Sequence, residues 1–194
     1  FGTNSSGKTS ILQLLLMLKQ TIESTDRAQV LEFGDEKSLT NLGSFRDTVH
    51  GHIKPGMMNF GLQWSLAKAL NVTSPEDKTR TLFSSNQLSL NCEVGENGSD
   101  RLTVFNLEYG LPDHKFALTR KGQSSGKYEL ESNESEFRFV RTTGRAWDLP
   151  APVKFYGFPD QVYAYYQNAG FLSTLQLEFE NLFNQVYYLG PLRE

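Results

Sequence analysis

Apolar residues follow two different spacings along this chain of 194 residues. The segment from Lys8 holds no Pro or Gly through Ser24, and apolar residues between Ile11 and Leu18 cover nearly the whole circumference of a helix. Near the other end, residues 171–186 carry apolar residues at helical spacing. The pattern therefore predicts a mostly buried helix early in the chain and an amphipathic helix late in it.

Between these helices, from about Met57, short runs alternate apolar and polar residues. Clusters of Gly, Asn, Asp, Ser and Pro separate the runs, as in hairpins. We therefore expect an antiparallel sheet in the middle of the chain, with short strands on either side of it. The expected strands are residues 29–33, 59–66, 79–94, 101–108, 114–120, 127–131, 137–142, 153–156 and 186–189.

Composition excludes several classes of protein. A formal charge of −3 gives no strongly basic platform for nucleic acid. Cys92 is the only cysteine, which excludes an intrachain disulfide framework and a cysteine-rich zinc site, and we interpret it as a small apolar residue in a strand. The apolar run from Ile11 to Leu18 is too short to span a bilayer. Without disulfides or a targeting segment, we expect a cytoplasmic protein.

The clearest chemical signal is the sequence G-T-N-S-S-G-K-T, which fits the Walker A or P-loop pattern G-x-x-x-x-G-K-[ST] at every fixed position. Gly2 and Gly7 permit backbone angles that turn successive N–H groups inward around phosphate oxygens. The helix that follows points its N-terminal N–H groups and positive dipole end at the same anion. The motif therefore predicts a nucleoside triphosphate bound with Mg²⁺.

Residue types assign roles within the motif. Lys8 places an ammonium against the β- and γ-phosphates and is the candidate catalytic residue, while Thr9 offers its hydroxyl to Mg²⁺. The expected nucleotide-binding residues are Gly2, Thr3, Asn4, Ser5, Ser6, Gly7, Lys8, Thr9 and Ser10.

With Asn4 at its third position, the motif resembles the loop G-x-N-x-S-G-K-[ST] of the ABC, SMC and RecF ATPases, although Ser5 departs from their usual Gly. Segments 2–20, 41–47 and 187–194 are similar to bacterial ATPases labelled AAA and related to the OLD (overcoming lysogenisation defect) proteins. The resemblance implies an α/β P-loop NTPase fold of the ABC/SMC-head type, with the P-loop helix packed on a largely antiparallel β lobe. It also implies ATP and Mg²⁺ as cofactors.

The resemblance further implies an ATP site shared by two heads, in which the partner supplies a signature loop and a Walker B strand supplies carboxylates. Asp35-Glu36 is the only Asp-Glu pair, and Glu32 and Gly34 interrupt the strand that a Walker B motif needs. Residues 172–176 resemble a signature loop but lack both of its glycines, so a capped ordinary helix explains them better. Both motifs are therefore expected outside this chain.

These features predict the N-terminal lobe of a longer ATPase head. Its expected parts are the P-loop and helix (1–24), a mainly antiparallel region (25–166), and a helix with a terminal strand (167–194). The lobe would bind ATP and drive DNA-repair, nuclease or phage-defence activity. Expected partners are a second head, a C-terminal lobe, and DNA or a nuclease, but no membrane. The alternative is a non-enzymatic module in which nucleotide gates partner binding.

Four further features have two interpretations each. His50 and His52 are candidate metal ligands or parts of a polar loop. Arg46 is a candidate nucleotide contact or a surface residue paired with Asp47 or another carboxylate, and Arg193 is a candidate contact to the nucleotide or to the C-terminal lobe expected outside this chain. The aromatic run at residues 155–166 is suited to stacking on nucleic-acid bases or to a half-buried sheet face.

Overall fold

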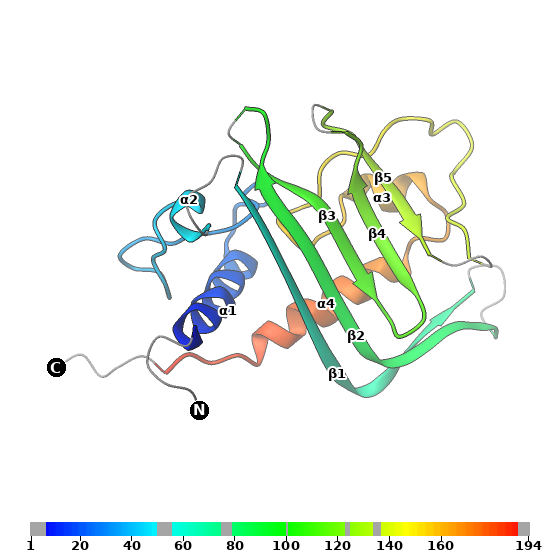
Figure 1. The fold of residues 1–194 in the computed structure, drawn as a ribbon. Helices are drawn as coiled ribbons and strands as arrows, with labels where there is room; N and C mark the ends of the chain where they lie inside the picture. The colour runs from blue at the N-terminus through cyan, green and yellow to red at the C-terminus, as the bar shows by residue number, and fades with distance from the viewer. Residues whose placement is uncertain are drawn as a thin grey trace.

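A five-stranded antiparallel sheet with its strands in sequence order is the main layer of the molecule (Figure 1). The computed structural model describes residues 7–49, 56–74, 79–99, 101–122, 125–133 and 137–189. The strands are β1 (Met57–Thr73), β2 (Thr81–Glu96), β3 (Leu102–Gly110), β4 (Lys115–Arg120) and β5 (Tyr128–Ser132). The helices are α1 (Lys8–Glu23), α2 (Phe45–Thr48), α3 (Asp160–Tyr165) and α4 (Phe171–Asn184).

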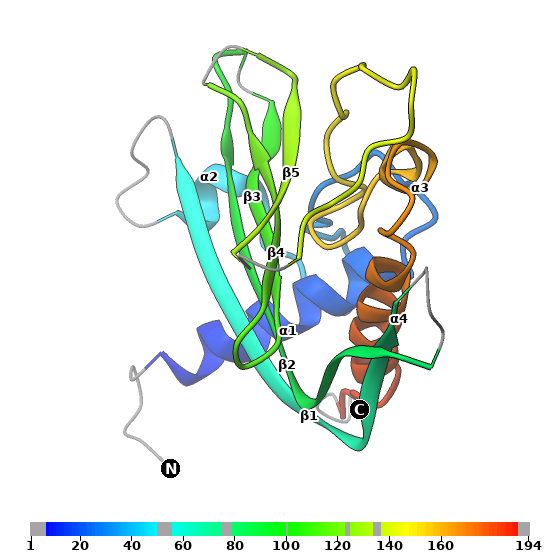
Figure 2. The same cartoon turned by 90° about the vertical axis from the view of Figure 1, so that its right-hand side faces the viewer.

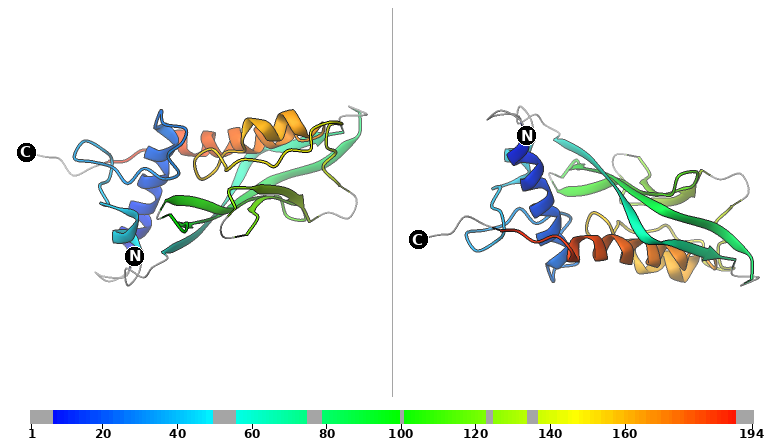
Figure 3. Two further views of the ribbon diagram at one scale, coloured as in Figure 1. Left: turned by 90° about the horizontal axis from the view of Figure 1, so that it is seen from above. Right: turned by 90° about the horizontal axis from the view of Figure 1, so that it is seen from below.

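The helices take positions on one side and at one end of this sheet. Figure 2 shows α3 and α4 on the same side of the sheet. Figure 3 shows α1 lying crosswise to α4 at one end of the molecule. Neither α1 nor any other described helix combines the length and apolar character needed to cross a bilayer.

The expected α/β P-loop NTPase fold is wrong for this chain. All four strand pairs are antiparallel, whereas a P-loop NTPase has a parallel sheet core. The connections explain the difference, because a parallel pair needs a crossover of about a dozen residues or more. The link from β3 to β4 covers only residues 111–114. A link of this length can form a hairpin but cannot form a parallel crossover.

Sequence alternation located the strands of the sheet and failed outside it. The five runs from 59–66 to 127–131 are confirmed as β1 to β5, and both long helices are confirmed. Residues 29–33, 137–142, 153–156 and 186–189 are not strands, and two of these segments form only isolated bridges, Arg141 with Tyr166 and Val153 with Gly157. The first three of these segments insert apolar side chains into the core as loops, among them Leu31, Phe137 and Phe155, whereas residues 187–189 are exposed.

The core lies between the sheet and α4. Alternate residues of β2 are buried, as a pleated strand requires: Leu88, Leu90, Cys92 and Val94. One stripe of α4 is buried against them: Leu172, Leu175, Phe179 and Phe183. Cys92 has the structural role expected of it, since its thiol donates to the carbonyl of Phe155 at 3.2 Å and burial raises the pKa of the thiol.

Candidate functional site

The described part of the Walker A motif is the junction between the loop and α1. Gly7 is the N-cap of α1 and has φ 78° and ψ 3°, a left-handed conformation that side chains with a Cβ resist. Its carbonyl accepts the first helical hydrogen bond, from the N–H of Ile11 at 3.2 Å. Residues 2–6 of the motif lie outside the described residues. The chain thus enters α1 through a backbone geometry that glycine allows.

The first turn of α1 has the features of an anion site. Lys8, Thr9 and Ser10 are exposed, the N-cap residue Gly7 has no side chain with which to cap the helix, and no acidic residue lies in the first turn. The N–H groups of a first turn have no helical acceptors, and the helix dipole makes that end positive. Phosphate oxygens can therefore reach these N–H groups together with the side chains of Lys8 and Thr9.

The C-terminal half of α1 is bound to the loop that follows it. The amide of Gln20 donates to the carbonyl of Glu32 at 2.7 Å and accepts from the N–H of Thr40 at 3.2 Å. The Thr21 hydroxyl accepts from the N–H of Glu32 at 2.8 Å and donates to the carbonyl of Met17 at 2.7 Å. Both side chains are buried, so these bonds hold α1 against the loop.

Two lysines tie α1 to the rest of the fold. Lys154 is buried with φ 54°, and its ammonium donates to the carbonyls of Ile22 at 2.9 Å and Ser24 at 2.6 Å. A cation at the C-terminal end of a helix complements its dipole, although burial lowers the pKa of this ammonium. Lys19 of α1 donates to the carbonyl of Phe183 in α4 at 3.1 Å. The fixed end of α1 therefore positions its exposed first turn.

The expectation that the first helix is mostly buried holds only for its second half. Leu16, Met17 and Leu18 are buried, but Ile11 and Leu12 are 63% and 60% exposed. Apolar residues occur in both halves of the helix, but the rest of the fold buries only the second half. The exposed half is the half that carries the motif residues.

A groove of about 540 Å³ adjoins the first turn, and we call it the α1 groove. Its lining residues come from α1, the loop after it, α2 and β1: Ser10, Gln13, Leu14, Met17, Asn41, Leu42, Asp47, Thr48, Met58, Asn59 and Phe60. Apolar side chains alternate with amides, a combination typical of small-molecule sites. Ser10 belongs both to this groove and to the expected nucleotide-binding residues.

Arg46 forms an ion pair with a buried carboxylate. Its Nε lies 2.6 Å from Oε1 of Glu96, whose side chain is only 8% exposed. Arg46 is therefore paired with a carboxylate, as the second interpretation of this residue expects. The segment around it still approaches the motif helix, because Asn41 and Asp47 line the α1 groove.

The aromatic run forms part of the core. Phe155, Tyr156, Phe158 and Tyr166 are buried around α3, so they are not free to stack on bases, and they do not form a sheet face either. His50, His52 and Arg193 lie outside the described residues. Within the described parts of the chain, no group of three or more His, Cys, Asp and Glu side chains could hold a metal ion.

The two rejected motif candidates have ordinary structures. Asp35 and Glu36 lie in an exposed turn, where the N–H of Lys37 and the hydroxyl of Ser38 bind the Asp35 carboxylate and lower its pKa. Residues 172–176 belong to α4. The N-cap of α4 is Gly170, and Ser173 lies inside the helix, where its hydroxyl donates to the carbonyl of Gly170 at 2.6 Å.

Comparison with known protein families, curated proteins and solved structures gives no match. The resemblance to ATPases thus rests on the motif residues themselves. Sequence reasoning missed Gln13 and Asn59, which lie in no motif and meet only in the folded chain. The single signal for Gln13 is that it interrupts the otherwise apolar run from Ile11 to Leu18.

Proposed function

We propose that this chain binds ATP with Mg²⁺ through the phosphate groups, at residues 2–10. The observation that carries the proposal is a complete Walker A sequence that enters a helix through left-handed Gly7 and ends at an exposed first turn. Lys8 would contact the β- and γ-phosphates, and Thr9 would hold Mg²⁺, which neutralises phosphate charge. As part of an ATPase, the site would drive DNA-repair, nuclease or phage-defence activity in the full protein.

The α1 groove supports a nucleotide over a free phosphate. A nucleoside needs an apolar surface and a few polar groups close to the phosphate site. The groove begins at Ser10 and offers Leu14 and Phe60 beside the amides of Gln13 and Asn59. The base and ribose would lie there while the phosphates occupy the first turn.

One observation favours a second candidate, a module that binds nucleotide to gate a partner. Phosphoryl transfer needs a group that orients the attacking water and a carboxylate for Mg²⁺. Asp47 is the acidic residue that lines the α1 groove, and its Oδ2 already accepts from the N–H and the hydroxyl of Ser44, both at 2.7 Å. Hydrolysis would then depend on groups from a second copy or another partner.

Replacing Lys8 with alanine should weaken binding of ATP with Mg²⁺ by roughly 10- to 100-fold, because charge-assisted hydrogen bonds to phosphate are lost. The measurement is calorimetric titration of the whole chain. Lys37→Ala is the matched control, since Lys37 is exposed in a turn and does not line the α1 groove, and the affinity of this variant should equal that of the native chain. Equal affinity of the Lys8→Ala variant and the native chain would contradict the proposal.

Phosphate release from the same samples separates the two candidates. Turnover that the Lys8→Ala variant loses indicates an ATPase. Tight binding of ATP without turnover indicates the gating module, because binding needs only the loop and the first turn whereas hydrolysis needs the additional groups.

A further inference from the structure

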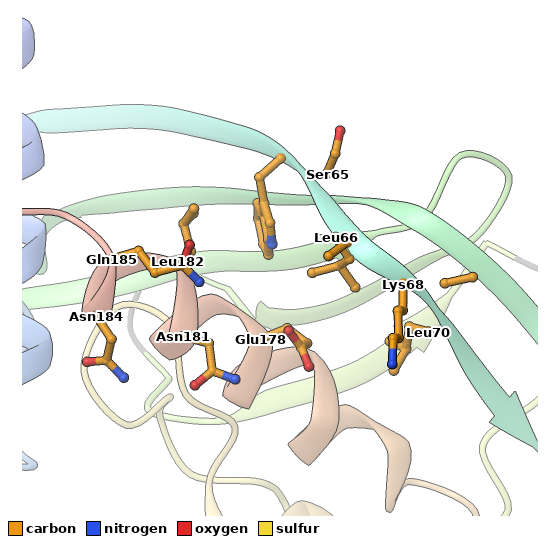
Figure 4. Close-up of a pocket in the computed structure, with 12 residues that line it drawn as sticks. Ser65, Leu66, Lys68, Leu70, Glu178, Asn181, Leu182, Asn184 and Gln185 are labelled. Atoms are coloured by element: carbon orange, nitrogen blue, oxygen red, sulfur yellow. The ribbon is translucent and has the colours of Figure 1, made fainter.

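A second groove, of about 830 Å³, separates the edge strand β1 from the C-terminal half of α4 (Figure 4). We call it the β1–α4 groove. Leu66, Lys68 and Leu70 point from β1 toward α4, and Glu178 and Leu182 lie on the opposite wall. The amides of Asn181, Asn184 and Gln185 continue the α4 wall. Each wall thus carries leucines together with polar side chains, and the groove shares no lining residue with the α1 groove.

The β1 side of this groove offers backbone hydrogen-bonding groups. β1 is an edge strand that pairs only with β2 in the described sheet. Its register with β2 breaks between Ser65, opposite Gln87, and Leu70, opposite Ser85. The four residues 66–69 of β1 therefore face a single residue of β2, and the strand bulges where it lines the groove. The unpaired edge of β1 on either side of this bulge is a template for another extended chain.

Trp64 gives an independent sign of an absent partner. The residue lines the groove, is 9% exposed and packs on Phe179 of α4, with ring centroids 5.7 Å apart. Its indole Nε1 is buried and has no acceptor among the described residues. A buried donor without an acceptor is unfavourable, and a carbonyl that entered the groove would relieve it.

We propose that the β1–α4 groove binds an extended peptide segment of another protein, which adds to the edge of β1 and lies along α4. Main-chain groups of the segment would pair with β1, and one carbonyl would accept from Trp64 after the lining side chains part. Lys68 and Glu178 stand on opposite walls, so the segment carries an acidic side chain toward β1 and a basic one toward α4. Apolar side chains between them pack on Leu66, Leu70 and Leu182.

Charge favours a peptide over nucleic acid as the occupant. Lys68 is the sole basic residue of the lining, and it faces Glu178 in a chain whose formal charge is −3. Phosphate backbones need several cations along their path. A peptide can carry one acidic and one basic side chain to match Lys68 and Glu178, and its main-chain groups can pair with β1.

The test uses Trp64 as its own reporter. The chain has two tryptophans, and Trp147, which is 56% exposed, does not line the groove, so a Trp147→Phe variant leaves Trp64 as the single emitter. The probe is a positional-scanning library of blocked hexapeptides, each with one acidic and one basic position among β-branched residues. We expect selected pools to shift Trp64 emission and N-methylation of the selected peptide backbone to weaken binding by 10-fold or more.

Charge reversal gives the matched comparison. Lys68→Glu should replace the preference for an acidic position by a preference for a basic one, whereas Lys37→Glu should leave it unchanged. The proposal is overturned if no pool binds, or if binding ignores both N-methylation and Lys68→Glu. It is equally overturned if an oligothymidine, used in place of the peptides, shifts Trp64 emission, because the occupant is then nucleic acid. A chain that dimerises on its own and that Lys68→Glu dissociates would also overturn it, because the occupant is then a second copy.

Discussion

Replacing Phe179 with alanine should lower the free energy of unfolding by about 4 kcal/mol, the usual size of a large-to-small change in a closed core. Phe179 is fully buried in α4 and joins that helix to the sheet and to the α3 region. Its ring contacts five others: Trp64, Tyr109, Phe155, Tyr156 and Phe183. Alanine removes all five contacts and leaves a cavity that rigid strands on one side cannot fill.

Urea unfolding followed by circular dichroism measures this loss. Leu177→Ala is the control, because Leu177 lies on the same helix but is 51% exposed, and its substitution should cost roughly 0.5 kcal/mol or less. Similar losses for the two variants would show that α4 is not held to the sheet through Phe179.

Raising the pH from about 8 to about 11 should destabilise the chain by roughly 3 kcal/mol through Tyr109 and Tyr128 alone. Burial raises the pKa of Tyr128 to about 12 and the pKa of Tyr109 well above its ordinary value. The Tyr128 hydroxyl donates to the carbonyl of Val104 at 2.6 Å, and the Tyr109 hydroxyl donates to the carbonyl of Tyr156 at 2.9 Å. The protonated form of each tyrosine is therefore also held by a hydrogen bond.

The sign follows from proton uptake. In the unfolded chain these tyrosines ionise near pH 10, while the folded chain keeps its protons, so the folded state binds more protons above that pH. The stabilisation is complete below about pH 10 and is lost as the pH rises through the folded pKa values. Burial also raises the pKa of Tyr163 to about 12, and burial with the bond to the Glu180 carboxylate raises that of Tyr156, which steepens the loss.

Urea unfolding at the two pH values, with tyrosinate absorbance as the second signal, measures this effect. Tyr128→Phe should reduce the alkaline loss by roughly 1.4 kcal/mol, the share of one protected hydroxyl at one pH unit above its unfolded pKa. Tyr187→Phe should leave the loss unchanged, because Tyr187 is 85% exposed. An alkaline loss that Tyr128→Phe does not reduce would contradict the assignment.

Sequence pattern predicted the sheet because its signal is local. Alternation and hairpin punctuation between residues 57 and 132 act over a few residues, and the strands form there as expected. The Walker A residues predicted a phosphate site for the same reason, but a loop motif carries no information on strand direction. The fold class inferred from the resemblance to ATPases was therefore wrong, while short connections such as 111–114 already required hairpins.

Long-range packing was beyond the reach of the sequence. Ile11 and Leu12 continue the apolar pattern of α1, yet they are exposed because the covering layer ends before them. Residues 137–142 and 153–156 alternate like strands, yet they cover the core as loops. The two grooves likewise depend on segments that meet only in the folded chain, as Asn59 and Gln13 do in the α1 groove.

ATP phosphates are expected to bind where the Walker A loop enters α1. The most direct test of this binding is the amide ¹H–¹⁵N spectrum of the whole labelled chain during titration with ATP and Mg²⁺. We expect the largest shifts at Gly7, Lys8, Thr9 and Ser10, with smaller ones at Gln13 and Asn59 of the α1 groove. Saturating ATP that leaves these amides unchanged, or that shifts only residues elsewhere such as the β1–α4 groove, would contradict binding at this site.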